Sequence, residues 1–444
     1  MKIRLPILLV ILILLCMVSV GLYYLPPIHS RLAWRIDDLR ARVREVFSPP
    51  ESIEFISSEA MAEANPSALP VSTTTPIPTN TPVPTQTAPE DTPLPTFTPT
   101  LTPTPLPASI SLTSDTFRYM HQHGAYNYCA PATLGMALSF WGWEGDRTDT
   151  GKVVKPYPKD LNVMPYEMED FAETQARLGA ITRVGGDSDL IKRLVAAGLP
   201  VLVEKGVYFR DLSGVVSWMG HYQLVTGYDD GKGIFITQDS YVEPGENHPE
   251  PYDTFLSNWR SFNYTYIVLY PPEREAEVLA VLGPHADETY NLQYAANLAS
   301  EEVYSGLTGV DLLFAWYNRG TNLVKLQDYG GAATAYDQAF SIYNTLPEDK
   351  SVRPYRILWY QTGPYYAYYY TGRYYTVIDL ADSSLEAVFY DDTSPEESLY
   401  WRGMAKLALG DNSGAIADFR ESIDPYHPGF EPSVYQLTQL GVEP

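Results

Sequence analysis

A long run rich in proline and threonine, residues 64–108, most constrains the fold of this 444-residue chain. Such a composition has too few apolar side chains to form a core, and proline favours an extended backbone without internal hydrogen bonds. We therefore expect a disordered linker that separates the N-terminus from globular domains after residue 108. A chain of this length has room for two or three domains.

The N-terminus carries an uncharged apolar stretch, residues 5–25. About twenty such residues span a bilayer, and no small-residue cleavage signal follows the stretch. Residues 1–27 are therefore predicted to be a cytoplasmic tip and an uncleaved transmembrane signal anchor, and residues 28–63 a juxtamembrane segment. Cys16 lies within the apolar stretch and lacks the small preceding residue of a lipoprotein signal, which argues against lipidation.

The location of the C-terminal part rests on two opposed signals. Arginines of residues 31–44 follow the apolar stretch, and a count of cations alone would place them in the cytoplasm. The threonine-proline run resembles the stalks of bacterial surface proteins, and we therefore expect a single-pass membrane protein with extracellular C-terminal domains. The net charge of −24 argues against nucleic acid as a partner.

A cysteine stands at a predicted helix start, because residues 126–134, which include Cys129, run directly into the helical pattern of residues 135–141. The amide dipoles of a helix N-terminus lower the pKa of a thiol and favour the nucleophilic thiolate. The chain has two cysteines, and Cys16 belongs to the apolar stretch, so Cys129 is predicted to be a free thiol. It is a candidate nucleophile, although a lone cysteine is also often a small buried hydrophobe.

A predicted hairpin carries a histidine and an aspartate. Residues 220–228 alternate β-branched and aromatic side chains, residues 229–231 form an Asp-Asp-Gly turn, and residues 234–238 form a second strand. His221 lies at the entry of the first strand and Asp239 at the end of the second. Antiparallel pairing can therefore place these two side chains next to each other.

The order Cys, His, Asp, with the cysteine on an early helix and the other two residues on a later sheet, is the layout of papain-like peptidases. The cysteine helix, Gly-His-Tyr, the Gly-Tyr-Asp-Asp turn and Asp239 resemble the bacteriocin-processing peptidases, which trim double-glycine leader peptides. They resemble more closely the stand-alone domains of this kind in bacterial surface proteins. The resemblance covers about residues 110–272, and it implies that Cys129 is the nucleophile, His221 the general base and Asp239 the orienting carboxylate.

The resemblance also implies a glutamine upstream of the nucleophile. Its amide and the backbone N–H of the cysteine donate hydrogen bonds to the developing oxyanion. Gln122 is the glutamine of that stretch, but it lies farther from Cys129 than is usual, and Ala130 replaces the glycine that commonly follows the cysteine. His123 or Asn127 could supply the donor instead.

A metal site is a competing interpretation of the same segment. His121 and His123 would point the same way on a strand, and they could form a site with Cys129 or His221. Asp239 has no role in such a site, and paired histidines are common on solvated strand edges. We therefore expect neither a metal nor a cofactor.

The remaining pattern of residues 109–273 predicts an α+β papain-like domain. Helices are expected over residues 165–178 and 189–197, and strands over residues 200–204 and 264–270. A small mixed sheet covered by helices, with the cysteine helix on one side, is the expected result.

Residues 285–440 change to a pattern of helix pairs. Small, aromatic and proline positions recur about every 40 residues, and they resemble tetratricopeptide repeats with extended loops. The landmarks are Ala315–Gly320 with Leu326–Ala333, Trp359–Gly363 with Thr371–Tyr374, and Tyr400–Gly403 with Leu409–Ala417. An all-α repeat domain that binds a protein partner or a substrate is predicted.

These patterns favour a membrane-anchored, extracytoplasmic cysteine peptidase that acts on peptides or proteins. The chain has no P-loop and no multi-span transporter region, so leader processing coupled to export is not expected. A second hypothesis is a catalytically silent peptide-capture module of the same fold. A third treats the whole chain as a scaffold for the repeats.

Overall fold

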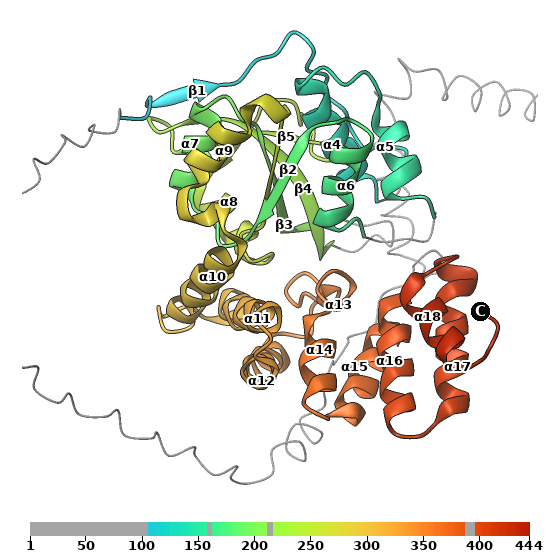
Figure 1. Cartoon of the computed structure of the whole chain (residues 1–444). Helices are drawn as coiled ribbons and strands as arrows, with labels where there is room; N and C mark the ends of the chain where they lie inside the picture. Colours follow the sequence, from blue (N-terminus) through green and yellow to red (C-terminus); the bar gives the residue numbers. More distant parts are fainter. Residues whose placement is uncertain (1–104, 126, 158–161, 211–215, 387–395) are drawn as a thin grey trace, which may run out of the picture.

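The computed structural model describes residues 105–125, 127–157, 162–210, 216–386 and 396–444, and Figure 1 shows how they are arranged. The predictions for residues 1–104, which include the signal anchor and most of the linker, lie outside these ranges. Within these ranges, no helix has both the length and the apolar content needed to cross a bilayer.

A seven-stranded sheet forms the centre of the N-terminal region, with the strand order β2-β7-β3-β4-β5-β6 and with β1 paired to β4. The strands are β1 (Ser109–Ser111), β2 (Gly179–Arg183), β3 (Val201–Arg210), β4 (Val216–Asp229), β5 (Ile234–Asp239), β6 (His248–Pro251) and β7 (Tyr266–Tyr270). Every pairing between these strands is antiparallel, so the prediction of a mixed sheet is wrong. The strands β4, β5 and β6 follow one another through short connections, which favour antiparallel neighbours.

Helices cover both faces of the sheet (Figure 1). One face packs against α4 (Cys129–Phe140) and α6 (Pro165–Thr174), and its core includes Leu202 and Leu224. The other face packs against α7 (Ser188–Ala196), α8 (Tyr252–Arg260) and α9 (Glu275–Leu282), and its core includes Val201, Val203 and Val225. Because successive strand residues point to opposite faces, one apolar run supplies both cores. Helix α5 (Arg147–Val154) lies beside α4.

The two helices and two strands predicted for this region are present, but their first or last residues differ from the predicted ones. Helix α6 ends at Thr174, before the predicted end at residue 178, because the chain turns there to enter β2. Strand β3 continues to Arg210, well beyond the predicted end at residue 204. Pairing with the whole first half of β4 supports this extension.

The C-terminal region is helical. Short 3-10 turns (Pro272–Arg274 and Gly283–Ala286) flank α9 and lead into this region. Its helices are α10 (Glu288–Glu302), α11 (Gly309–Lys325), α12 (Tyr329–Thr345), α13 (Ile357–Tyr360), α14 (Gly363–Tyr370), α15 (Tyr374–Glu386), α16 (Glu396–Ala408), α17 (Asn412–Glu421) and α18 (Glu431–Gln439), with a π turn (Ser422–Tyr426) before α18.

Small residues lie where the helices of a pair approach each other. A Cβ atom added to Gly320 on α11 would lie 2.7 Å from the Tyr336 ring on α12, and one added to Gly403 on α16 would lie 2.7 Å from the Phe419 ring on α17. The repeated contact of glycine with an aromatic ring explains the recurring small and aromatic positions of the sequence. That these pairs are tetratricopeptide repeats stays a prediction.

The sheet domain and the helical region share one hydrophobic cluster. Trp218 on β4 stacks on Phe262 at a ring distance of 5.5 Å, and Phe314 of α11 lies 5.6 Å from the Trp218 ring. Asn263 and Asn322 exchange two hydrogen bonds, of 2.7 and 3.1 Å, next to this cluster. Since these groups are buried, the helical region is fixed against the end of β3 and β4.

Candidate active site

Helix α4 places the candidate nucleophile against the centre of the sheet. Cys129 is the first residue of the helix, and its side chain is partly exposed. Four residues later, the Thr133 hydroxyl donates a 3.1 Å hydrogen bond to the carbonyl of Tyr222 on β4. This bond fixes the first turn of α4 beside the residue that follows His221.

The imidazole of His221 lies between the other two predicted site residues. The Nε2 atom of His221 lies 3.1 Å from Oδ1 of Asp239. The imidazole makes a second hydrogen bond, with the Cys129 thiol. Because Asp239 occupies Nε2, the nitrogen that faces the sulfur is Nδ1. The structure therefore brings together the three side chains that the sequence order selected.

A set of donors holds the Asp239 carboxylate. Its Oδ1 atom accepts hydrogen bonds from the backbone N–H groups of Tyr241 and Val242, at 2.7 and 3.0 Å. The Gln223 side-chain amide donates to Oδ2. Gln223 is not among the predicted site residues, although its position is a signal: it lies two residues after His221, so both side chains point to the same face of β4.

The electrostatics favour a thiolate and an imidazolium. Burial raises the pKa of Cys129, but the hydrogen bond and charge of His221 and backbone hydrogen bonds at Tyr222 and Ala130 outweigh burial, so that pKa is lowered. Burial lowers the pKa of His221, whereas the Asp239 charge and hydrogen bond, together with Cys129, raise it to about 10. Both shifts therefore favour the thiolate–imidazolium pair over a neutral thiol and a neutral imidazole.

Gln122 lies at the same pocket as Cys129 and His221. The Ser240 hydroxyl donates to its Oε1 atom at 2.9 Å, and the Gln122 backbone N–H donates to the Ser240 carbonyl at 2.8 Å. Since Ser240 holds the amide oxygen, the side-chain NH₂ is the end available to a substrate in this pocket. Ser240 directly follows Asp239, so one segment positions both residues.

The two alternative donors have different positions. Asn127 lines the pocket beside Cys129, and its φ angle of 49° sets the turn into α4. His123 is buried, and its Nε2 atom lies 2.7 Å from the Tyr241 carbonyl. Of the two alternatives, Asn127 is therefore the one that could replace Gln122 as the oxyanion donor at this pocket.

The pocket beside Cys129 is narrow, about 40 Å³, and aromatic groups line much of it. Its lining residues are Gln122, Asn127, Cys129, Ala130, Asn162, Val163, Glu204, Phe209, Met219, Gly220, His221, Tyr222, Tyr241 and Tyr360. Phe209 lies edge-on to the His221 ring at 5.2 Å and stacks on Tyr241 at 4.5 Å. The Phe209 ring therefore packs against the imidazole, and Tyr241 packs behind Phe209.

Glu204 is a buried carboxyl group in this pocket that the sequence analysis missed. Burial raises its pKa to about 8, a hydrogen bond with Tyr222 opposes that shift, and the nearby Cys129 charge adds to it. Glu204 faces Tyr222 in the β3–β4 register. The available signal was an acidic residue within the otherwise apolar start of β3.

The competing metal site has no ligand set in the part of the chain that the structure describes. The rings of His121 and His123 lie 5.8 Å apart and are tilted by 31°. No group of three or more His, Cys, Asp or Glu side chains gathers there, or elsewhere among the described residues, in a way that could hold a metal ion.

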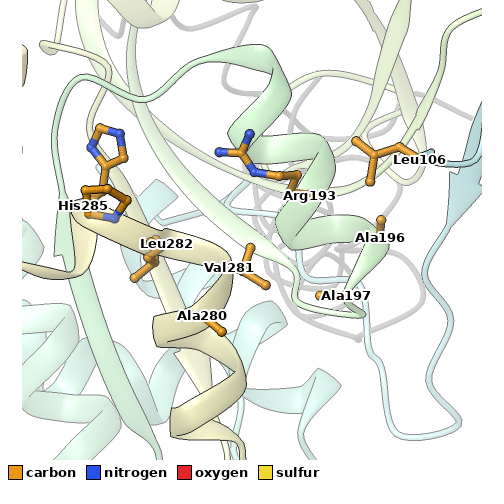
Figure 2. A pocket seen from close by; sticks show the side chains of 10 residues that line it. Leu106, Arg193, Ala196, Ala197, Ala280, Val281, Leu282 and His285 are labelled. Carbon is orange, nitrogen blue, oxygen red and sulfur yellow. The ribbon is translucent and has the colours of Figure 1, made fainter. Parts of the chain in front are cut away.

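A second and larger cavity, of about 580 Å³, lies between α7 and α9. Figure 2 shows its lining, which combines small and aliphatic side chains with Arg193 and His285. None of the predicted site residues lines this cavity. It is therefore separate from the site at Cys129.

Comparisons with known proteins give one family match and two similar solved structures. Residues 114–267 match the sequence model of the Peptidase_C39 like family. Among solved structures, the chain is similar to a candidate C39-like peptidase from Bacillus anthracis, with 14% identity and a TM-score of 0.29, over 36% of this chain and 96% of that one. It is also similar to Xylellain, a cysteine protease from Xylella fastidiosa, with 17% identity and a TM-score of 0.29, over 38% of this chain and 87% of that one.

None of the curated proteins matches the chain. The family match spans α4, the β4–β5 hairpin and most of the sheet, and it includes Cys129, His221 and Asp239. Residues 114–267 are therefore a Peptidase_C39-like domain, followed in the same chain by a helical region.

Proposed function

We propose that this chain is a cysteine peptidase in which Cys129, His221 and Asp239 form the catalytic triad. The observation that carries the proposal is the position of the His221 imidazole, which hydrogen-bonds both the Cys129 thiol and Asp239. This arrangement stabilises a thiolate at neutral pH and holds the imidazole in one orientation. The family match supports peptides or proteins as substrates.

The reaction begins when the Cys129 thiolate attacks the carbonyl carbon of a peptide bond, and the carbonyl electron pair moves onto oxygen. The backbone N–H of Cys129 and the Gln122 amide stabilise that oxyanion. His221 donates its proton to the leaving amine as the C–N bond breaks, which leaves a thioester on Cys129. His221 then takes a proton from water, the resulting hydroxide cleaves the thioester, and the carboxylic acid product and the free thiolate form.

A covalent labelling experiment tests this proposal. The full chain is incubated at neutral pH with a fluorescent peptide that carries a thiol-directed electrophile, and the labelled residue is identified by mass spectrometry. We expect rapid labelling that is lost in Cys129→Ala, kept in the matched control Cys16→Ser and strongly slowed in His221→Ala. Labelling no faster than that of a model thiol would instead favour the silent capture module.

We also propose that residues 5–25 anchor the chain in a membrane with the peptidase domain outside the cell. Support comes from the length and apolar character of that segment and from the threonine-proline run that follows it. Adding a protease to intact cells tests this orientation. Loss of residues 105–444 from the cell-associated protein is expected, and protection of those residues until the cells are lysed would reverse the proposed orientation.

A further inference from the structure

The helical region contributes a residue to the pocket beside Cys129. Tyr360 is the last residue of α13, and it lines that pocket together with Cys129 and His221. Figure 1 shows α13 at the end of the sheet where β3 and β4 meet the helical region. The pocket is therefore built from two regions of the chain that are far apart in sequence.

The Tyr360 ring approaches the backbone beside the candidate base. A Cβ atom added to Gly220, which directly precedes His221, would lie 2.9 Å from two ring carbons of Tyr360. The same ring meets Trp218 and Phe262 edge-on, each at 5.8 Å. A glycine at position 220 thus allows a close contact that any larger side chain would disturb.

Two hydrogen bonds fix α13 on the peptidase domain at either side of Tyr360. The Arg356 guanidinium donates to the Ser217 hydroxyl at 2.7 Å. The Gln361 amide donates to the Ser261 carbonyl, also at 2.7 Å. Because Arg356 and Gln361 lie on either side of Tyr360 in the sequence, these two hydrogen bonds hold the Tyr360 ring in one position relative to His221.

A second cavity, between the two regions, shares one lining residue with the pocket at Cys129. Asn162 lines both the pocket at Cys129 and a neighbouring cavity. The neighbouring cavity lies between residues 164–167 of the peptidase domain and residues 358–359 of α13, and residues 396–398 of α16 also line it. The two cavities thus adjoin at Asn162, and residues of α13 line both of them.

We infer that the helical region forms one wall of the substrate cleft and that Tyr360 is a specificity-determining residue that contacts the substrate. The inference rests on the peptidase function proposed above. The favoured substrate is an extended peptide with an apolar side chain next to the scissile bond, because Phe209, Met219 and Tyr360 surround that position. Further residues of the peptide pass Asn162 and follow α13.

The test compares two alkylating probes on the full chain with Cys16→Ser as background, so that Cys129 is the one thiol. Iodoacetamide reports the reactivity of the Cys129 thiolate, whereas a peptidyl chloromethyl ketone with an apolar residue next to the reactive group also reports binding in the cleft. In Tyr360→Ala, we expect the ratio of the peptidyl rate to the iodoacetamide rate to fall about tenfold, as expected for the loss of one buried aromatic contact. Tyr360→Phe keeps the ring and should keep the ratio.

The matched control is Tyr375→Ala, since Tyr375 lies in the same region and is 72% exposed. If the ratio of the peptidyl rate to the iodoacetamide rate is equal in Tyr360→Ala and Tyr375→Ala, and Cys129 still reacts with iodoacetamide, the inference is overturned. Failure of both probes on the unmodified chain would instead overturn the proposed peptidase function. The two failures are thus distinct.

A second measurement on the unmodified chain does not depend on the folding of a variant. A peptidyl electrophile with a photoreactive diazirine several residues from its reactive group is attached to Cys129 and then irradiated. Crosslinks to the segment around Tyr360 are expected. Crosslinks confined to residues 105–271 would contradict a wall formed by the helical region.

Discussion

Oδ1 of Asp239 lies 3.1 Å from Nε2 of His221, and both side chains are buried. The two residues come from neighbouring strands of one hairpin, so the relationship depends on the register of β4 and β5 rather than on a mobile loop. In this arrangement a carboxylate stabilises the imidazolium and holds Nδ1 toward the thiol.

Asp239→Asn removes the charge that most strongly raises the pKa of His221. That pKa falls, so the imidazolium loses its proton at a lower pH and the thiolate–imidazolium pair exists over a narrower range. We expect kcat/KM to fall about a hundredfold and the alkaline limb of its pH profile to move to lower pH. The profile of the full chain measures this shift. The exposed Asp253→Asn is the matched control, and an unchanged alkaline limb in Asp239→Asn would contradict the role of Asp239.

Gln122→Ala separates oxyanion stabilisation from thiolate reactivity. Peptide hydrolysis passes through an oxyanion, whereas alkylation by iodoacetamide does not. We expect hydrolysis to fall about a hundredfold or more, with the alkylation rate within about twofold of the unmodified chain. Asn127→Ala is the comparison variant, because Asn127 lines the same pocket. A large loss of hydrolysis in Asn127→Ala, with Gln122→Ala unaffected, would transfer the donor role to Asn127.

Glu204→Gln tests the buried carboxyl through the pH dependence of stability. The folded-state pKa of Glu204 is about 8, above its ordinary value of 4.5, so between these values the folded state keeps a proton that the unfolded state has lost. Stability therefore falls as pH rises through this window, and Glu204→Gln removes that fall. The free energy of unfolding of the variant should exceed that of the unmodified chain by a difference that grows by up to about 1.4 kcal/mol per pH unit.

Denaturant unfolding at several pH values between 5 and 8 measures this difference. Glu273→Gln is the matched control, because Glu273 is exposed. Parallel pH dependences in Glu204→Gln and the unmodified chain would show that Glu204 is already ionised at neutral pH.

Much of the candidate site could be predicted because its signals are local. Cys129 at a helix start, and His221 and Asp239 at the ends of a hairpin, depend on patterns within short segments. Strand β7 lies between β2 and β3 and pairs antiparallel with both, although both precede it by many residues in the chain. Short sequence segments carry no signal for such long-range pairing. For that reason the sheet was predicted to be mixed, and β1, β2 and β6 were missed.

Contacts between the two regions were also beyond prediction. Tyr360 reaches the pocket at Cys129 through the packing of α13 on Trp218 and Phe262, which residue spacing does not encode. The holding groups Gln223 and Ser240 lie close in sequence to His221 and Asp239, and strand alternation could have indicated Gln223.

Trp218→Ala tests whether the two regions unfold together. Trp218 is buried in the cluster that joins the sheet to the helical region, so its removal should lower the free energy of unfolding by about 3–5 kcal/mol. Urea unfolding followed by circular dichroism measures this loss, and the unmodified chain should unfold in one transition. Trp316→Ala, at a partly exposed tryptophan, should cost less. Two separate transitions in the unmodified chain would contradict the shared core.

The most direct test of the central claim is the ultraviolet titration of the Cys129 thiolate, with Cys16→Ser as background so that one thiol remains. We expect a midpoint below 9.0, the ordinary value for a thiol, because His221 stabilises the thiolate. Adding His221→Ala should raise that midpoint, since the charge and hydrogen bond of the imidazole no longer oppose the effect of burial. A midpoint that stays the same with and without the imidazole would contradict a catalytic pair of Cys129 and His221.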